Sequence, residues 1–133
     1  MNTLASALVS QAQAFFDRYA QDFDCADWFA FSSHYHEPAF SVRADGSVAV
    51  LSNRSAVADF FKYVWSTWRA EGYSRFGISD LSAVPVGEQS ALITFTWHLL
   101  RDDGSQIRQW NQSYQLLQVS GVWKVLSSTF HKA

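Results

Sequence analysis

Two residues near the start of the chain have side chains that can transfer protons. Tyr19 carries a phenol and Asp24 a carboxyl group, and both groups act as general acids or bases in enzymes. Each residue also has a structural interpretation. Asp24 can cap the N-terminus of a helix, and Tyr19 can be a core residue whose hydroxyl bonds to the backbone. Both are candidate catalytic residues, but they do not by themselves define a reaction.

Arg75 is the candidate for holding a ligand by charge. A guanidinium can bind a carboxylate or carbonyl oxygen in a pocket, although on a strand it can equally be a solvent-exposed charge. His34 and His36 have the residue type of metal ligands, but side chains two residues apart point to different sides of a helix. The sequence contains no Gly-rich phosphate loop, cysteine pair or nucleophile elbow. We therefore predict no metal and no cofactor.

Composition limits the classes of protein that fit. The 133 residues are 48% hydrophobic and 17% aromatic, which predicts a single folded domain over residues 1–133 with rings to spare for a pocket or an interface. A net charge of −2 without a basic run argues against nucleic-acid or membrane-surface partners. The single Cys25 fits a reducing compartment, and no signal peptide or membrane-length apolar run is evident. We expect a cytoplasmic protein.

The first half of the chain predicts three helices and a hairpin. Apolar residues recur at helical spacing, so each helix has one face to bury. The second helix is expected to be capped by Asp24 and to end before Pro38, and the third to be capped by Asn53 or Ser55. The predicted helices cover residues 3–20, 24–36 and about sixteen residues ending near Gly72, and the hairpin joins 39–43 to 47–51.

The second half predicts four longer strands and hence an α+β fold. The strands cover residues 73–84, 91–101, 106–119 and 122–130, with Asp-Gly and Ser-Gly turns between the last three. The stretch 106–119 has fourteen residues, whereas strands usually have about five or six. A strand this long must bend, and a curved sheet against helices encloses a cavity.

The order of these elements resembles the nuclear-transport-factor-2-like superfamily, in particular its SnoaL-like branch. Three stretches carry the resemblance: Phe23-Asp-Cys-Ala-Asp-Trp28, Phe76–Ala91 leading into the next strand, and Gly121-Val-Trp-Lys-Val125. The resemblance implies a conical, curved antiparallel sheet packed against three N-terminal helices, with a pocket at the wide end and often a homodimer through the sheet. It does not imply one activity, because this scaffold hosts many functions.

Two enzymes of this scaffold provide templates for a site. A steroid-isomerase-like site is matched by Tyr19, but the positions of its two acids fall near Val42-Arg43 and Ser113, which are not carboxylic acids. A scytalone-dehydratase-like site is matched by Asp24, but Arg75 occupies one histidine position and residues 107–111 contain no histidine for the other. Neither template is complete in this chain.

The expected pocket has aromatic walls and a few polar groups. We expect Tyr19, Trp28, Trp65 and Trp97 in the walls, with Arg75, Asn111 and Ser113 supplying polarity. On the strand 106–119, Asn111 and Ser113 share one face and Trp110 and Tyr114 the other. Simple amphipathicity puts the rings in the core, whereas the resemblance puts Asn111 and Ser113 in the cone and the rings at a dimer face. We favour the second arrangement.

Three functions are compatible with these residues and this resemblance. The first is binding of a small apolar or aromatic molecule in the cone. The second is an acid–base lyase or isomerase for a cyclic or polyketide-like substrate, with Asp24 or Tyr19 transferring the proton and Arg75 holding a carbonyl. The third is a homo-oligomeric interaction module whose cone is filled by Phe61, Trp65 and Trp97.

Overall fold

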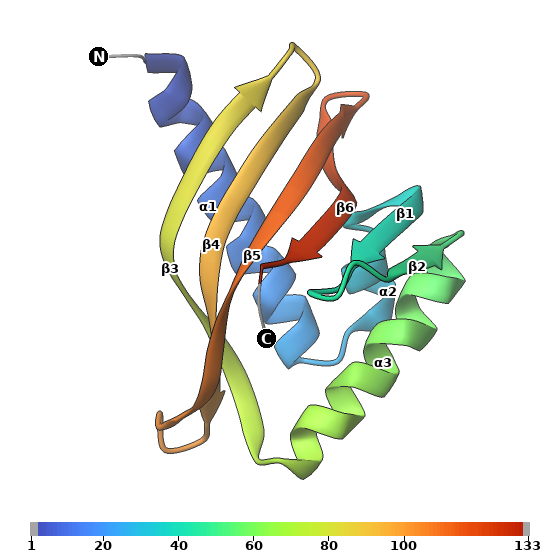
Figure 1. Ribbon diagram of the computed structural model, residues 1–133, viewed down its shortest axis with the longest axis vertical. Helices are drawn as coiled ribbons and strands as arrows, with labels where there is room; N and C mark the ends of the chain where they lie inside the picture. Colours follow the sequence, from blue (N-terminus) through green and yellow to red (C-terminus); the bar gives the residue numbers. More distant parts are fainter. Residues whose placement is uncertain (1–2, 132–133) are drawn as a thin grey trace.

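The computed structural model describes residues 3–131 and has the α+β fold that the sequence predicts (Figure 1). Among these residues no helix is both long enough and apolar enough to cross a lipid bilayer. The elements in chain order are α1 (Thr3–Asp24), α2 (Trp28–Ser32), β1 (Tyr35–Val42), β2 (Val48–Leu51), α3 (Arg54–Ala70), β3 (Tyr73–Val86), β4 (Ser90–Arg101), β5 (Gln106–Val119) and β6 (Val122–Phe130).

All six strands belong to one sheet, in the order β2-β1-β6-β5-β4-β3. The pairs β1·β2, β3·β4, β4·β5 and β5·β6 are antiparallel, whereas β1 and β6 run parallel. The predicted curved sheet packed against N-terminal helices is therefore confirmed, and it contains one parallel pair among its antiparallel pairs. A parallel pair requires a long connection, and here that connection is all of the chain between β1 and β6.

The long strands bend, as predicted for residues 106–119. Register shifts insert an extra residue in β3 between Ser79 and Ser82 and in β5 between Gln106 and Arg108, and Asp80 at the first shift has a φ of 59°. Bulges of this kind increase local twist and curvature. In Figure 1, β3, β4 and β5 curve around α1, which crosses behind them. We call the face toward α1 the inner face and the opposite face the outer face.

The region between α1 and β1 differs from the prediction. Asp24 is the last residue of α1, and Asp27 is the cap of a five-residue α2, with its Oδ1 accepting from the Ala30 amide at 3.1 Å. Tyr35 begins a strand because residues 35–42 pair with β6 and β2. Pairing in the sheet thus overrides the helical spacing of the local sequence.

The core lies between α1 and the inner face. Phe16 of α1 packs edge-on against Phe95 of β4, with ring centroids 4.8 Å apart, and lies 4.7 Å from Tyr114 of β5. Tyr114 is 2% exposed, whereas Asn111 is exposed on the outer face. The expectation that Trp110 and Tyr114 face outward and Asn111 and Ser113 face the cone is therefore wrong, because α1 covers the face with the larger apolar area.

Candidate functional site

An open cavity of about 240 Å³ lies between α3 and the inner face of the sheet. We call it the mouth cavity. Its α3 side is mostly aromatic, and its sheet side comes from the ends of β1 and β6 and from the middle of β5. The lining residues from the sheet side are Ser41, Arg43, Gln112, Ser128 and Phe130, and those from α3 are Phe60, Phe61, Tyr63, Val64, Thr67 and Trp68.

Three polar side chains form the inner end of the mouth cavity. Ser41, Gln112 and Ser128 are 5%, 5% and 3% exposed. Ser41 pairs with Ser128 across β1 and β6, and Ser128 pairs with Tyr114 across β6 and β5. Paired residues share a face of the sheet, so the two hydroxyls lie side by side on the inner face. Within residues 3–131 neither hydroxyl has a hydrogen-bond partner.

The amide of Gln112 has a fixed orientation. Its Oε1 accepts a hydrogen bond from Trp110 Nε1 at 3.0 Å. An indole nitrogen can only donate, so the oxygen must face Trp110 and the NH₂ group must point away from it. Among the described residues no acceptor bonds to that NH₂ group. Gln112 therefore offers two hydrogens near the paired serines.

The inner end of the cone is almost filled by aromatic side chains. A cavity of only about 30 Å³ remains there, bordered by Tyr19, Trp97, Tyr114 and other rings. This volume exceeds the roughly 10–15 Å³ that one water molecule needs. A bound molecule larger than a few atoms therefore does not fit at the inner end of the cone.

Three buried tyrosines lie at this small inner cavity: Tyr19 and Tyr114 line it, and Tyr35 contacts Tyr19. The hydroxyls of Tyr19 and Tyr35 are 2.7 Å apart, and Trp97 Nε1 donates to the Tyr114 hydroxyl at 2.9 Å. Burial raises the pKa of all three phenols well above the usual value of 10. The phenols therefore stay protonated and do not act as bases.

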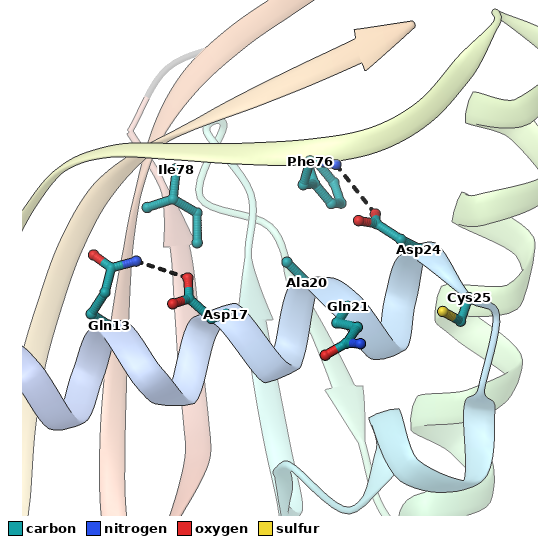
Figure 2. Close-up of a pocket in the computed structure, with 8 residues that line it drawn as sticks. All are labelled: Gln13, Asp17, Ala20, Gln21, Asp24, Cys25, Phe76 and Ile78. Carbon is teal, nitrogen blue, oxygen red and sulfur yellow. Dashed lines mark hydrogen bonds between the residues drawn. The ribbon is translucent and has the colours of Figure 1, made fainter. Parts of the chain in front are cut away.

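A second concavity, of about 430 Å³, is an open groove between α1 and the edge strand β3 (Figure 2). Asp24 lies at one end of it, and its Oδ1 accepts from the Phe76 amide at 3.2 Å and from the Tyr73 hydroxyl. Burial raises the pKa of Asp24 to about 6, although both hydrogen bonds act to lower it. The Asp24 carboxylate thus satisfies an N–H on the outer edge of the sheet, which is a structural role.

The structure separates the predicted pocket residues. Tyr19 and Trp97 line the small cavity at the inner end of the cone. Trp28 of α2 and Trp65 of α3 pack against each other, with ring centroids 6.2 Å apart. Trp65 does not line the mouth cavity, and its Nε1 is buried without a partner among the described residues.

The predicted polar residues lie elsewhere. Arg75 is exposed beside Gly104 in the β4–β5 turn. On the outer face, Asn111 accepts from Thr96 at 2.7 Å, and Ser113 bonds to Thr94 at 2.8 Å. None of the three lines the mouth cavity.

The histidines also have separate environments. His34 bonds to Asp22 at 2.7 Å, and His36 bonds to the carbonyl of Pro38 at 2.8 Å. Within residues 3–131 no three His, Cys, Asp or Glu side chains form a group that could hold a metal ion.

Sequence reasoning missed the polar residues of the mouth cavity. One signal was available: Gln112 lies between Trp110 and Tyr114, in the apolar middle of its strand face. A polar residue in the middle of a buried strand face requires a partner or a function. Ser41 and Ser128 carry no comparable signal, because small polar residues are common in strands that are partly exposed.

Comparison with known proteins identifies the family. A family model described as NTF2-like protein (DUF6841) matches residues 10–133. The chain belongs to the NTF2-like proteins. No curated protein matches this NTF2-like chain.

Solved structures share the fold of this NTF2-like protein at low sequence identity. Aln2 from a Streptomyces species has a TM-score of 0.76 and 16% identity, over 99% of this chain and 93% of its own. An NTF2-like protein with a cystatin-like fold from Novosphingobium aromaticivorans has a TM-score of 0.73 and 16% identity, over 91% and 79%. A protein of unknown function with a cystatin-like fold from Nostoc punctiforme has a TM-score of 0.73 and 11% identity, over 98% and 92%. These similarities establish the fold alone.

Proposed function

We propose that this NTF2-like protein binds a small, planar, mostly apolar molecule in the mouth cavity. The observation that carries the proposal is the combination of an open, aromatic-walled cavity with three buried polar residues at its inner end. Ligand sites are typically concave and apolar with a few placed polar groups. The polar atoms of these residues are open to the cavity, where water or a ligand can hydrogen-bond to them.

The shape and size of the cavity limit the ligand. Its volume of about 240 Å³ is below the roughly 300–1,000 Å³ of sites for drug-sized molecules. Phe61 and Trp68 on one side and Phe130 on the other present rings to the space. Planar rings gain about 0.5–1.5 kcal/mol from each offset or edge-on contact with such walls. A small fused-ring compound fits these conditions.

The two alternative functions have less support in the geometry. The acid–base alternative loses Tyr19, which lies in the core away from Arg75. Asp24 and Arg75 do lie near each other at the α1–β3 groove, but Asp24 Oδ1 already accepts hydrogen bonds from Tyr73 and the Phe76 amide. The interaction module requires a filled cone, and Trp97 does fill the inner end. The mouth cavity remains open, however, and Trp65 lies outside it.

A matched pair of α3 variants tests the proposal. Thr67 lines the mouth cavity and Ser66 does not, and both are exposed residues whose hydroxyls bond back to the carbonyl four residues earlier. We expect Thr67→Trp to weaken binding of naphthol at least tenfold by occupying the cavity, and Ser66→Trp to bind as wild type does. Isothermal titration calorimetry provides the affinities. Absence of saturable binding of naphthol and related planar compounds to wild type would refute the function, and unchanged binding by Thr67→Trp would refute its location.

A further inference from the structure

The described residues that line the mouth cavity carry positive charge and no negative charge. Arg43 is the only residue with a formal charge among its described lining residues, and no Asp or Glu lines it. Arg43 follows directly after β1, at the turn of the β1–β2 hairpin, where its amide donates to the Ser47 carbonyl at 2.9 Å. Its guanidinium is therefore at the rim, in contact with solvent. A ligand with a positive charge would find no counter-charge here, whereas an anion would.

The inner end of the cavity is rich in donors. Gln112 offers an NH₂ group whose direction is set by Trp110, and the hydroxyls of Ser41 and Ser128 are free to donate. These three residues are more than nine-tenths buried, and their donor atoms are reached through the mouth cavity. A ligand oxygen that accepts hydrogen bonds is the complementary group.

The rim and the inner end are separated along one strand. Ser41 and Arg43 are two residues apart, so their Cα atoms are separated by about 6.5 Å and their side chains point to the same side. A molecule that reaches both needs two polar ends. Between them lie the rings of Phe61, Trp68 and Phe130, which favour an aromatic middle.

From this arrangement we propose that the mouth cavity selects planar aromatic carboxylic acids that carry a second oxygen at the opposite end of the ring system. Arg43 binds the carboxylate at the rim, and Gln112 with Ser41 and Ser128 binds the inner hydroxyl or keto oxygen. The inference rests on the proposed function, since it names the ligand class of the same cavity. It assigns to Arg43 the role that the sequence suggested for Arg75.

Four related probes separate the two recognition elements. They are a hydroxynaphthoic acid with its two oxygen groups on opposite rings, its methyl ester, the naphthoic acid without the hydroxyl, and the naphthol without the carboxylate. We expect the hydroxynaphthoic acid to bind about tenfold more tightly than each of the other three, a difference of about 1.4 kcal/mol. Calorimetry at low and high salt should show the preference for the acid over its ester falling as salt rises.

Paired variants locate each element. Arg43→Gln should remove the preference for the acid over the ester and keep the preference for the hydroxylated acid. The double variant Ser41→Ala with Ser128→Ala should remove the preference for the hydroxylated acid and keep the preference for the acid over the ester. Neither should lower the melting temperature, because Arg43 is exposed and the two hydroxyls lack a partner among the described residues. Matched controls are Arg75→Gln, an exposed arginine outside the cavity, and Ser127→Ala, the outward-facing neighbour of Ser128.

The outcomes distinguish this inference from the proposed function. Equal binding of all four probes would overturn the inference and leave the proposed function standing. Binding of none of them would refute the proposed function as well. A preference for the acid that Arg75→Gln abolishes and Arg43→Gln preserves would overturn the assignment of the rim.

Discussion

Asp24 shows how one partly buried carboxyl group makes stability depend on pH. Burial raises its pKa from 3.8 to about 6, more than the hydrogen bonds from Tyr73 and Phe76 lower it. The folded state therefore binds this proton more tightly than the unfolded chain does. The stabilising contribution is fully present below about pH 4 and is lost as the pH rises through about 6.

We expect Asp24→Asn to remove this loss of stability. The amide keeps an acceptor oxygen for Tyr73 and Phe76 but carries no charge to desolvate. Because Asp24 is partly exposed, the expected gain over wild type is only about 1 kcal/mol at pH 7, with none at pH 4. Urea unfolding at both pH values measures it, with Asp17→Asn as the exposed control on the same groove. A variant less stable than wild type at pH 7 would contradict the role assigned to burial.

The residues of the site were only partly predictable, for a physical reason. Residue types suggested which side chains could do chemistry, but the strand phase decides which ones meet. A shift of one residue moves every side chain of a strand to the other face. The predicted strand phase therefore places Asn111 and Ser113 in the cone, whereas the structure places Gln112 there. The correct phase depends on which face α1 covers, and that is a tertiary contact.

At the scale of elements, α3 was predictable because its signals are local. An apolar stripe, a cap and a terminal glycine together define it. Between the two candidate caps, the structure has Asn53, whose Oδ1 accepts from the Ala56 amide at 2.9 Å. The stretch after α1 was not predictable in this way, because Tyr35 is a strand residue only through its pairing with β6.

The cap gives a prediction for the stability of α3. Asn53→Ala should lower the free energy of unfolding by about 1 kcal/mol, because an amide at the start of the helix loses its acceptor. Ser55→Ala, at the other candidate cap, should change it by less than about 0.5 kcal/mol. Chemical denaturation measures both. Equal losses in the two variants would show that Asn53 has no special role.

Because α3 forms one wall of the mouth cavity, Asn53→Ala should also weaken naphthol binding.

At the scale of the whole molecule, the order of elements and the length of one strand predict the fold. The strand phase from which the sequence predicts a homodimer is wrong. That phase places Trp110 and Tyr114 on the outer face, whereas both lie on the inner face. The outer face instead has cross-strand hydrogen bonds, including Thr96 to Asn111 and Ser79 to His98 at 2.7 Å each. The homodimer stays a prediction on different grounds.

The homodimer is now predicted from the outer face of β3, β4 and β5, which no described helix covers and which has apolar side chains at one end. In Figure 1 α1 crosses behind β3, β4 and β5, α2 and α3 lie to the right of them, and no described helix crosses in front of them. Val84 and Leu92 are paired across β3 and β4 on this face and are 53% and 41% exposed. A second copy of the chain, related by two-fold symmetry, would present the same polar rows and the same apolar pair. We therefore expect Leu92 to be buried in a dimer.

The prediction is tested by placing a charge on this face. Light scattering of the wild type should give twice the chain mass of 15.1 kDa at micromolar concentration. Leu92→Glu should give the single-chain mass, since burying a carboxylate in an interface without a partner costs several kcal/mol. Val50→Glu on the opposite edge strand β2, where Val50 is 60% exposed, is the control and should remain dimeric. A single-chain mass for the wild type would refute the dimer, and a dimeric Leu92→Glu would move the interface away from this end of the outer face.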